Sequence, residues 1–84
     1  MTTLPPPRLG AQLSDRELDV LDGIARGLSN ARIACELDLS PETVATHVRR
    51  LLAKLGARDR AHAVARGFRW GLLDPGAPAD GGQR

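Results

Sequence analysis

The chain has 84 residues, a formal net charge of +2 and one cysteine, so it can form one small domain but no internal disulfide bond. Its apolar residues are mostly aliphatic, and no apolar run reaches the length of a membrane-spanning helix. A secretion signal and the alternating runs typical of strands are missing, so we expect a cytoplasmic, all-α protein.

Four helices are predicted between two tails. The Pro-rich residues 1–12 are expected to form a flexible N-terminal tail, and the Gly/Pro/Ala-rich residues 74–84 a disordered C-terminal tail. The structured domain is then 13–73. Capping residues and apolar periodicity predict its helices over 15–26, 30–37, 41–55 and 60–70.

The first two helices have clear start signals. Ser14 and Glu17 form a capping box before the helix over 15–26, and Gly27 is expected to end that helix. Ser29 or Asn30 caps the helix over 30–37. The predicted inward residues are Leu18, Leu21, Ala25 and Leu28, flanked by Val20 and Ile24, in the first helix, and Ile33, Ala34 and Leu37 in the second.

The helix over 41–55 follows a tight turn at Asp38 and Leu39, with Ser40 as its cap and Pro41 at its first position. At about 100° per residue, the apolar residues gather on one side and polar, basic or small residues on the other. Such a helix fits the major groove of DNA. The apolar side carries Val44, Val48, Leu51, Leu52 and Leu55, and the opposite side Glu42, Thr46, Arg49 and Ala53.

The outer side of this helix is predicted to read bases. Arg49 can donate two hydrogen bonds to guanine, and Thr46 can touch a thymine methyl group or a base edge. Thr43 and Arg50 lie at the edge of this side, where phosphate contacts are expected. The complete predicted phosphate set is Ser29, Asn30, Arg32, Thr43, His47, Arg50 and Lys54, supported by Arg58 and Arg60.

The helix over 60–70 has two candidate faces. One face, with Ala61, Val64, Ala65 and Phe68, is expected to pack inward. The other carries Ala63, Gly67 and Trp70 at i, i+4 and i+7 spacing and is predicted to contact a second copy of the chain. Helix periodicity alone equally allows Trp70 to cover the end of the protein's own core.

Charge is divided along the chain. Residues 14–42 hold seven acidic against three basic side chains, a net −4, whereas 49–69 hold seven basic against one acidic, a net +6. A basic C-terminal half indicates a face for a polyanion, although a solvated charged surface would give the same pattern.

A wider pattern runs through the whole predicted domain. Its elements are Leu13, Ser14, Arg16, Glu17, Val20, Leu21, Gly27, Ser29, Asn30, Ile33, Ala34, Leu37, Ser40, Thr43, Val44, His47, Val48, Lys54, Leu55, Gly56, Arg60, Ala63, Val64, Gly71 and Leu72. Through them, residues 13–73 resemble the LuxR-type (GerE- or NarL-type) DNA-binding domain of bacterial transcription regulators.

The resemblance implies a four-helix fold in which 30–37 and 41–55 form the helix-turn-helix. It also implies a sequence-specific regulator of double-stranded DNA that works at the bacterial nucleoid. This regulator would form a homodimer through its last helix on a two-fold symmetric site. Ala31 and Ala45 depart from the pattern, because the family often has lysine at both positions. Two phosphate or base contacts are therefore expected to be lost, with Arg32 replacing the first in part.

Two questions stay open at this level. A helix-turn-helix with fewer basic contacts can also serve as an adaptor that binds a sigma factor, RNA polymerase or another regulator; Arg49 and Arg50 favour DNA. Larger family members carry a regulatory domain before the helix-turn-helix. The chain is then either a stand-alone regulator or the C-terminal part of a longer protein, and Met1 favours the first.

Other reactive side chains are given structural roles. His47 has no second ligand at metal spacing, so a structural or phosphate-contacting imidazole is expected, and His62 is expected to be exposed. Cys35 is either a redox-sensitive thiol or a small, half-buried helix residue, and its acidic neighbours favour the second. Because no nucleophile–base pair or phosphate-binding glycine loop is present, we expect no enzyme activity, no metal and no cofactor.

Overall fold

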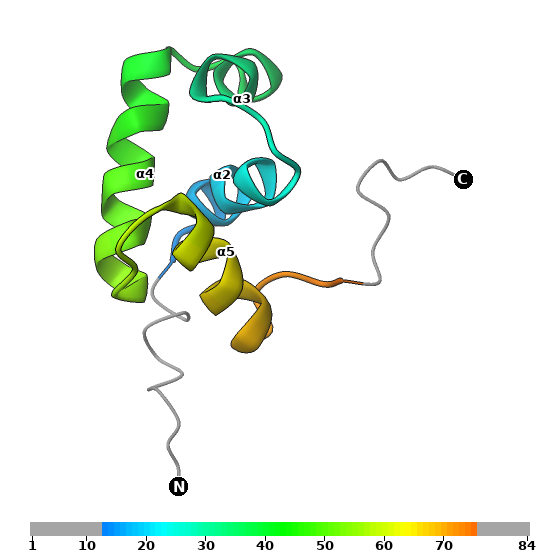
Figure 1. The fold of residues 1–84 in the computed structure, drawn as a ribbon. Helices are drawn as coiled ribbons and strands as arrows, with labels where there is room; N and C mark the ends of the chain where they lie inside the picture. Colours follow the sequence, from blue (N-terminus) through cyan, green and yellow to red (C-terminus); the bar gives the residue numbers. More distant parts are fainter. Residues whose placement is uncertain (1–12, 76–84) are drawn as a thin grey trace, which may run out of the picture.

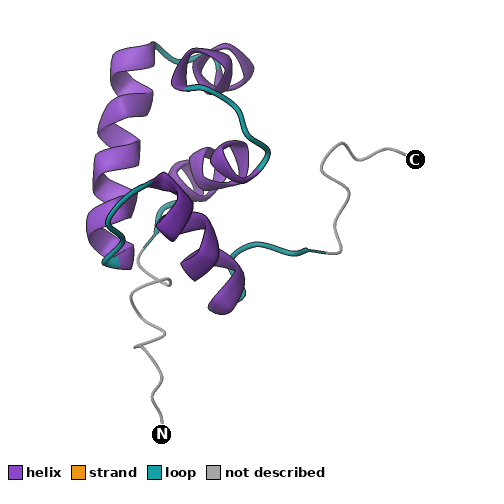
Figure 2. Cartoon of the chain, in the orientation of Figure 1, coloured by secondary structure: helices purple, strands orange, loops and turns teal. Residues whose placement is uncertain are grey.

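The computed structural model describes residues 13–75 (Figure 1). Within this range the chain forms helices α2 (Asp15–Ala25), α3 (Asn30–Leu37), α4 (Pro41–Leu55) and α5 (Arg60–Arg69), joined by loops and without strands (Figure 2). The all-α class and the four helices are confirmed, with two ends one residue earlier than predicted. None of these helices is long and apolar enough to cross a membrane. The tail predicted over 1–12 and all of the tail predicted over 74–84 except its first two residues lie outside the described residues.

Side-chain caps start the four helices, and Ser14, Ser29 and Ser40 are caps as predicted. The side chains of Ser14, Ser29, Ser40 and Asp59 each accept a hydrogen bond from a backbone N–H in the first turn. The turn between α3 and α4 is made by Asp38, whose φ of 61° lies in the left-handed region that few residues other than glycine adopt. This short turn keeps α3 and α4 together as one unit.

The core lies where α4 packs against α2, α3 and α5 (Figure 1). As predicted, the apolar side of α4 faces inward, and only Leu52 of that set is half-buried. Among residues 13–75, no helix covers the other side of α4 (Figure 1). The largest fully buried side chains are Val20, Leu21, Ile33, Val44, Leu51 and Leu55.

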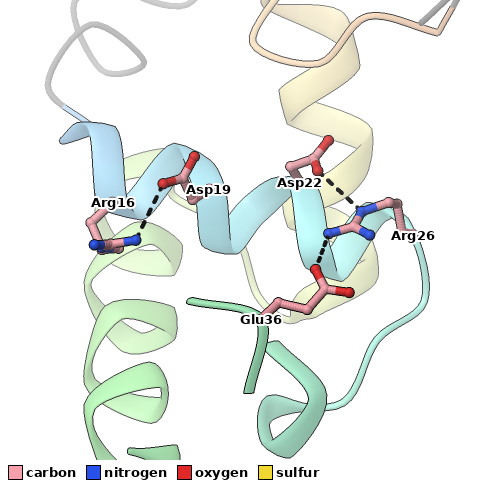
Figure 3. Close-up of polar contacts among 5 residues, drawn as sticks. All are labelled: Arg16, Asp19, Asp22, Arg26 and Glu36. Atoms are coloured by element: carbon pink, nitrogen blue, oxygen red, sulfur yellow. Dashed lines mark hydrogen bonds and ion pairs between the residues drawn. The ribbon is translucent and has the colours of Figure 1, made fainter. Parts of the chain in front are cut away.

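An ion-pair bridge ties α3 to α2 (Figure 3). The guanidinium of Arg26 lies 3.1 Å from Asp22 and 2.8 Å from Glu36, which is on α3. The hydrogen bond from Arg26 lowers the pKa of Glu36 below its usual value. A second pair, Arg16 with Asp19, stays within α2 and is exposed at both ends. The bridge helps to fix the angle at which α3 leaves α2.

On α5 the predicted dimer face is wrong at Ala63 and Gly67, whereas Val64 packs against the core as predicted. Ala63 is fully buried and Gly67 is buried, so neither is available to a second copy of the chain. Phe68, which was expected to pack inward, is 41% exposed. The reason lies beyond the helix: Leu73 folds back and packs on Gly67, leaving no room there even for a Cβ atom.

Candidate nucleic-acid interface

The outer side of α4 presents two arginines that no other described residue neutralises. Arg49 and Arg50 are exposed, and neither forms an ion pair within residues 13–75. Ala53, one turn from Arg49, is also exposed and small, so it leaves room for a close approach to the helix backbone. The predicted lean, basic side of this helix is therefore present.

Thr46 and Arg49 form a connected pair on this side. The Thr46 hydroxyl donates to the carbonyl oxygen of Glu42 at 3.2 Å, and it accepts a hydrogen bond from Arg49 at 3.3 Å. The hydroxyl is thus occupied within the helix, which leaves the methyl group of Thr46 as its outward contact. Arg49 lies along the helix surface, and its guanidinium retains four further N–H donors.

The helix starts of α3 and α4 present hydroxyl donors. Ser29 and Thr43 are exposed, as is Arg32. The Ser29 oxygen accepts from the backbone of Arg32 at 3.2 Å, and the Thr43 oxygen accepts from the hydroxyl of Ser40 at 2.9 Å. Because both hydroxyl oxygens act as acceptors, their own hydrogens remain available for an anion.

Two predicted phosphate contacts, Lys54 and His47, face α2 instead. The Lys54 ammonium lies 2.8 Å from the carboxylate of Glu17, which is only 3% exposed. His47 is half-buried, its Nδ1 is enclosed without a hydrogen-bond partner, and its charge acts on the same carboxylate. Lys54 therefore contributes first to holding α4 on α2. No local pattern in the sequence indicates the Lys54–Glu17 pair, whose members are 37 residues apart.

Burial and pairing act in opposite directions on Glu17. Burial raises the pKa of its carboxyl, but the hydrogen bond from Lys54, the backbone N–H of Ser14 and the charges of Lys54 and His47 lower it. The lowering effects together outweigh the effect of burial. The pKa of Glu17 therefore lies below its usual value, and the group is ionised at neutral pH.

Asn30 and Arg60 are joined across the fold. Arg60 donates to the Asn30 side-chain oxygen at 2.7 Å and to the Leu28 carbonyl oxygen at 2.9 Å, and both side chains are half-buried. Arg60 was expected to support the DNA contacts, but its guanidinium donates both of these hydrogen bonds to oxygens of the protein itself. Arg58, two residues earlier, is exposed.

Three further side chains are now placed. Cys35 is exposed rather than half-buried, and His62 is half-buried rather than exposed, with its Nδ1 3.0 Å from the backbone N–H of Arg58. Trp70 is half-buried and packs against the core, with the Arg66 guanidinium 5.3 Å from its ring centroid. Residues 13–75 contain no group of three or more His, Cys, Asp or Glu that could hold a metal ion.

Comparison with known proteins identifies the family and the relatives to which this chain is similar. The family described as "Bacterial regulatory proteins, luxR family" matches residues 11–66. A "Probable transcriptional regulatory protein NarL" of Mycobacterium tuberculosis is 56% identical over 62 residues, covering 74% of this chain and 29% of that protein. The "Nitrate/nitrite response regulator protein NarP" of Escherichia coli is 53% identical over 52 residues, covering 62% of this chain and 24% of that protein.

A solved structure is also similar. Full-length FixJ from B. japonicum superposes with a TM-score of 0.69 at 36% sequence identity, over 80% of this chain and 33% of FixJ. The chain thus spans about a third or less of the length of each of these relatives.

Proposed function

This chain belongs to the luxR family of bacterial regulatory proteins, and we propose that it is a sequence-specific regulator that lays α4 in the major groove of double-stranded DNA. The observation that carries the proposal is the outer side of α4, which holds exposed Arg49 and Arg50 and has no helix packed over it. A regulator of this kind acts at the nucleoid, so its proposed location is the bacterial cytoplasm.

Base reading is assigned to Arg49 and Thr46. A guanidinium can donate two hydrogen bonds to guanine, a contact that gives about 1–3 kcal/mol of discrimination against a wrong base. Release of Arg49 from Thr46 breaks one exposed hydrogen bond of 3.3 Å, which is a small cost. The Thr46 methyl group then lies beside it for contact with a thymine methyl group.

Phosphate contacts orient the helix on DNA. The exposed contributors are Arg50 and Thr43 from α4 together with Ser29 and Arg32 at the start of α3, and Asn30 adds its side-chain amide. All of these groups except Arg50 lie at the N-terminal ends of two helices, where backbone N–H groups and the helix dipole also favour an anion. Lys54 takes part only at the expense of its ion pair with Glu17 of α2, and His47 is half-buried.

We assign the dimer contact to the exposed face of α5. Ala61, Ala65 and Phe68 are exposed there, and Val64 between them is half-buried. Phe68 is the one large apolar side chain left exposed among residues 13–75. A shallow groove beside Ala61 and Val64 is lined by the end of α2, at Ile24, Gly27 and Leu28, and by Arg60.

The spacing on α5 suits a two-fold pairing. In two antiparallel α5 helices that cross at Val64 and Ala65, Phe68 of one copy lies opposite Ala61 of the other, next to the groove. The face is small, so the dimer is weak in solution and tightens on DNA. Sedimentation equilibrium should show weaker self-association for Phe68→Ala than for the wild type, whereas Arg69→Ala, its exposed neighbour, should match the wild type. Equal self-association of Phe68→Ala and the wild type would contradict the assignment of this dimer contact.

Selection from a random duplex library tests the function as a whole. DNA reading by a two-fold dimer should enrich inverted repeats whose half-sites lie about one helical turn apart. Failure to enrich any sequence would contradict the proposal. It would favour the adaptor for a sigma factor, RNA polymerase or another regulator, because Ala31 and Ala45 already lack the basic groups that lysine would supply.

A further inference from the structure

We infer that Arg60 is a positioning residue that turns the side-chain amide of Asn30 so that its NH₂ group faces a DNA phosphate. The inference rests on the proposed function, because it concerns one phosphate contact of the same DNA-binding surface. Arg60 is on α5, the helix assigned to dimerisation, but it would act on Asn30 at the start of α3.

Arg60 is hydrogen-bonded to the side-chain oxygen of Asn30. Arg60 is the first residue of α5 and Asn30 the first residue of α3. One guanidinium nitrogen lies 2.7 Å from the Asn30 side-chain oxygen, and the other lies 2.9 Å from the Leu28 carbonyl oxygen. A planar guanidinium with two separate acceptors cannot swivel freely, so the amide oxygen that it binds is fixed as well.

The chemistry of an amide makes this fixation useful. An asparagine side chain has an acceptor at one end and two N–H donors at the other. Only the donor end attracts a phosphate, and rotation of the amide by half a turn would present its oxygen to the anion instead. Arg60 occupies the oxygen, and therefore the donor end is the one left over. The positive charge behind the oxygen also polarises the amide and strengthens its N–H donors.

Arg58 differs from Arg60 in that its side chain is open to solvent. It precedes α5 by two residues, and its side chain is exposed and forms no ion pair among residues 13–75. Arg60, by contrast, is half-buried and satisfies two protein oxygens. A side chain so engaged serves DNA through Asn30 rather than by touching it. Arg69, which is exposed on the same helix and has no assigned DNA contact, is the matched control, because the same substitution can be made at both positions.

Arg60→Lys separates positioning from direct contact. It keeps the charge but loses the planar fork, so we expect the affinity of the full 84-residue chain for a short labelled DNA duplex to fall about tenfold, the effect of losing one hydrogen bond to a charged group. Asn30→Ala should lose as much. The combination of Arg60→Lys and Asn30→Ala should lose no more than either change alone, because both remove the same contact. Arg69→Lys should bind as the wild type does.

Asn30→Asp gives a readout that does not depend on folding. The carboxylate keeps the bond from Arg60, so thermal stability should be maintained, yet it removes the donors and adds a negative charge. Binding should therefore weaken by more than tenfold while the unfolding temperature does not fall.

Several results would overturn the inference. Full affinity in Arg60→Lys would mean that only its charge matters, and additive losses in the double variant would mean that Arg60 acts independently of Asn30. Full affinity in Asn30→Asp would exclude the phosphate contact. In each of these cases the wild type still binds the duplex and the proposed function stands. Absence of wild-type binding would instead contradict the proposed function, and the inference with it.

Discussion

Glu17 shows how one side chain serves both a helix start and a helix contact. Its carboxylate accepts the backbone N–H of Ser14 at 3.0 Å, which closes the capping box of α2, and also accepts from Lys54 of α4 at 2.8 Å. The sequence predicts the first bond because a capping box is a local pattern. The second joins residues far apart in the chain, and no local pattern reveals it.

The pKa of Glu17 makes this contact dependent on pH. Because the pKa is lower in the folded chain than the usual 4.5, the stabilisation is present above about pH 4.5 and is lost as the pH falls through the folded value. Glu17→Gln should lower the free energy of unfolding by about 1–3 kcal/mol at neutral pH. The difference in the free energy of unfolding between Glu17→Gln and the wild type should narrow on acidification, as followed by urea unfolding at a series of pH values.

Glu36→Gln is the matched control, because it removes a carboxylate whose ion pair with Arg26 is exposed to solvent. Its effect should be clearly smaller than that of Glu17→Gln. A constant gap between Glu17→Gln and the wild type down to acidic pH would contradict this assignment of the Glu17 contact.

Among the elements, α4 and α5 show where sequence reasoning succeeds and where it fails. The apolar residues of α4 form one well-defined stripe between a proline start and a glycine end, and the structure confirms both its ends and its inward side. On α5 half of the positions hold alanine, valine or glycine, and these small residues occur on both candidate faces. The choice between them is made by Leu73, which lies outside the helix and packs on Gly67.

Gly67→Ala tests this packing. A Cβ atom there would lie 2.8 Å from Leu73 Cδ1, which is closer than Cβ atoms come to other atoms in proteins, and 3.2 Å from Leu21 Cδ2, which is tighter than most such contacts. Alanine gains about 0.5–1 kcal/mol in helix propensity over glycine, but overpacking costs about 1–3 kcal/mol. We therefore expect a net loss of about 1 kcal/mol or more in thermal unfolding.

Ala65→Leu, on the exposed side of the same helix, should leave stability nearly unchanged. If Gly67→Ala stabilised the chain while Ala65→Leu destabilised it, the helix would have the opposite orientation.

Across the whole molecule, the charge is more one-sided than the net +2 suggests. In the acidic half, Arg16 and Arg26 are paired with carboxylates, whereas Arg49 and Arg50 in the basic half have no ion-pair partners among residues 13–75. The sequence predicted the imbalance. The fold adds that the unpaired charges lie on the open side of α4, because contacts between distant residues decide which charges are neutralised.

Ala31→Lys should restore one phosphate contact that relatives with lysine there would make. Ala31 is exposed at the start of α3, so the longer side chain requires no repacking. The slope of log affinity against log salt concentration should steepen by about 0.9, with tighter binding at low salt. Ala53→Lys, also exposed but at the centre of the outer side of α4, should weaken sequence-specific binding instead. An unchanged slope in Ala31→Lys would place the start of α3 away from the DNA.

The central claim, that α4 reads bases through Arg49, is tested most directly by an affinity ratio. Wild type, Arg49→Ala and Arg50→Ala are each titrated against a duplex enriched from the library and against a scrambled duplex of equal length. We expect Arg49→Ala to lose about 5- to 150-fold on the enriched duplex and much less on the scrambled one. Arg50→Ala should lose the same factor on both. Equal losses for Arg49→Ala on the two duplexes would contradict the claim.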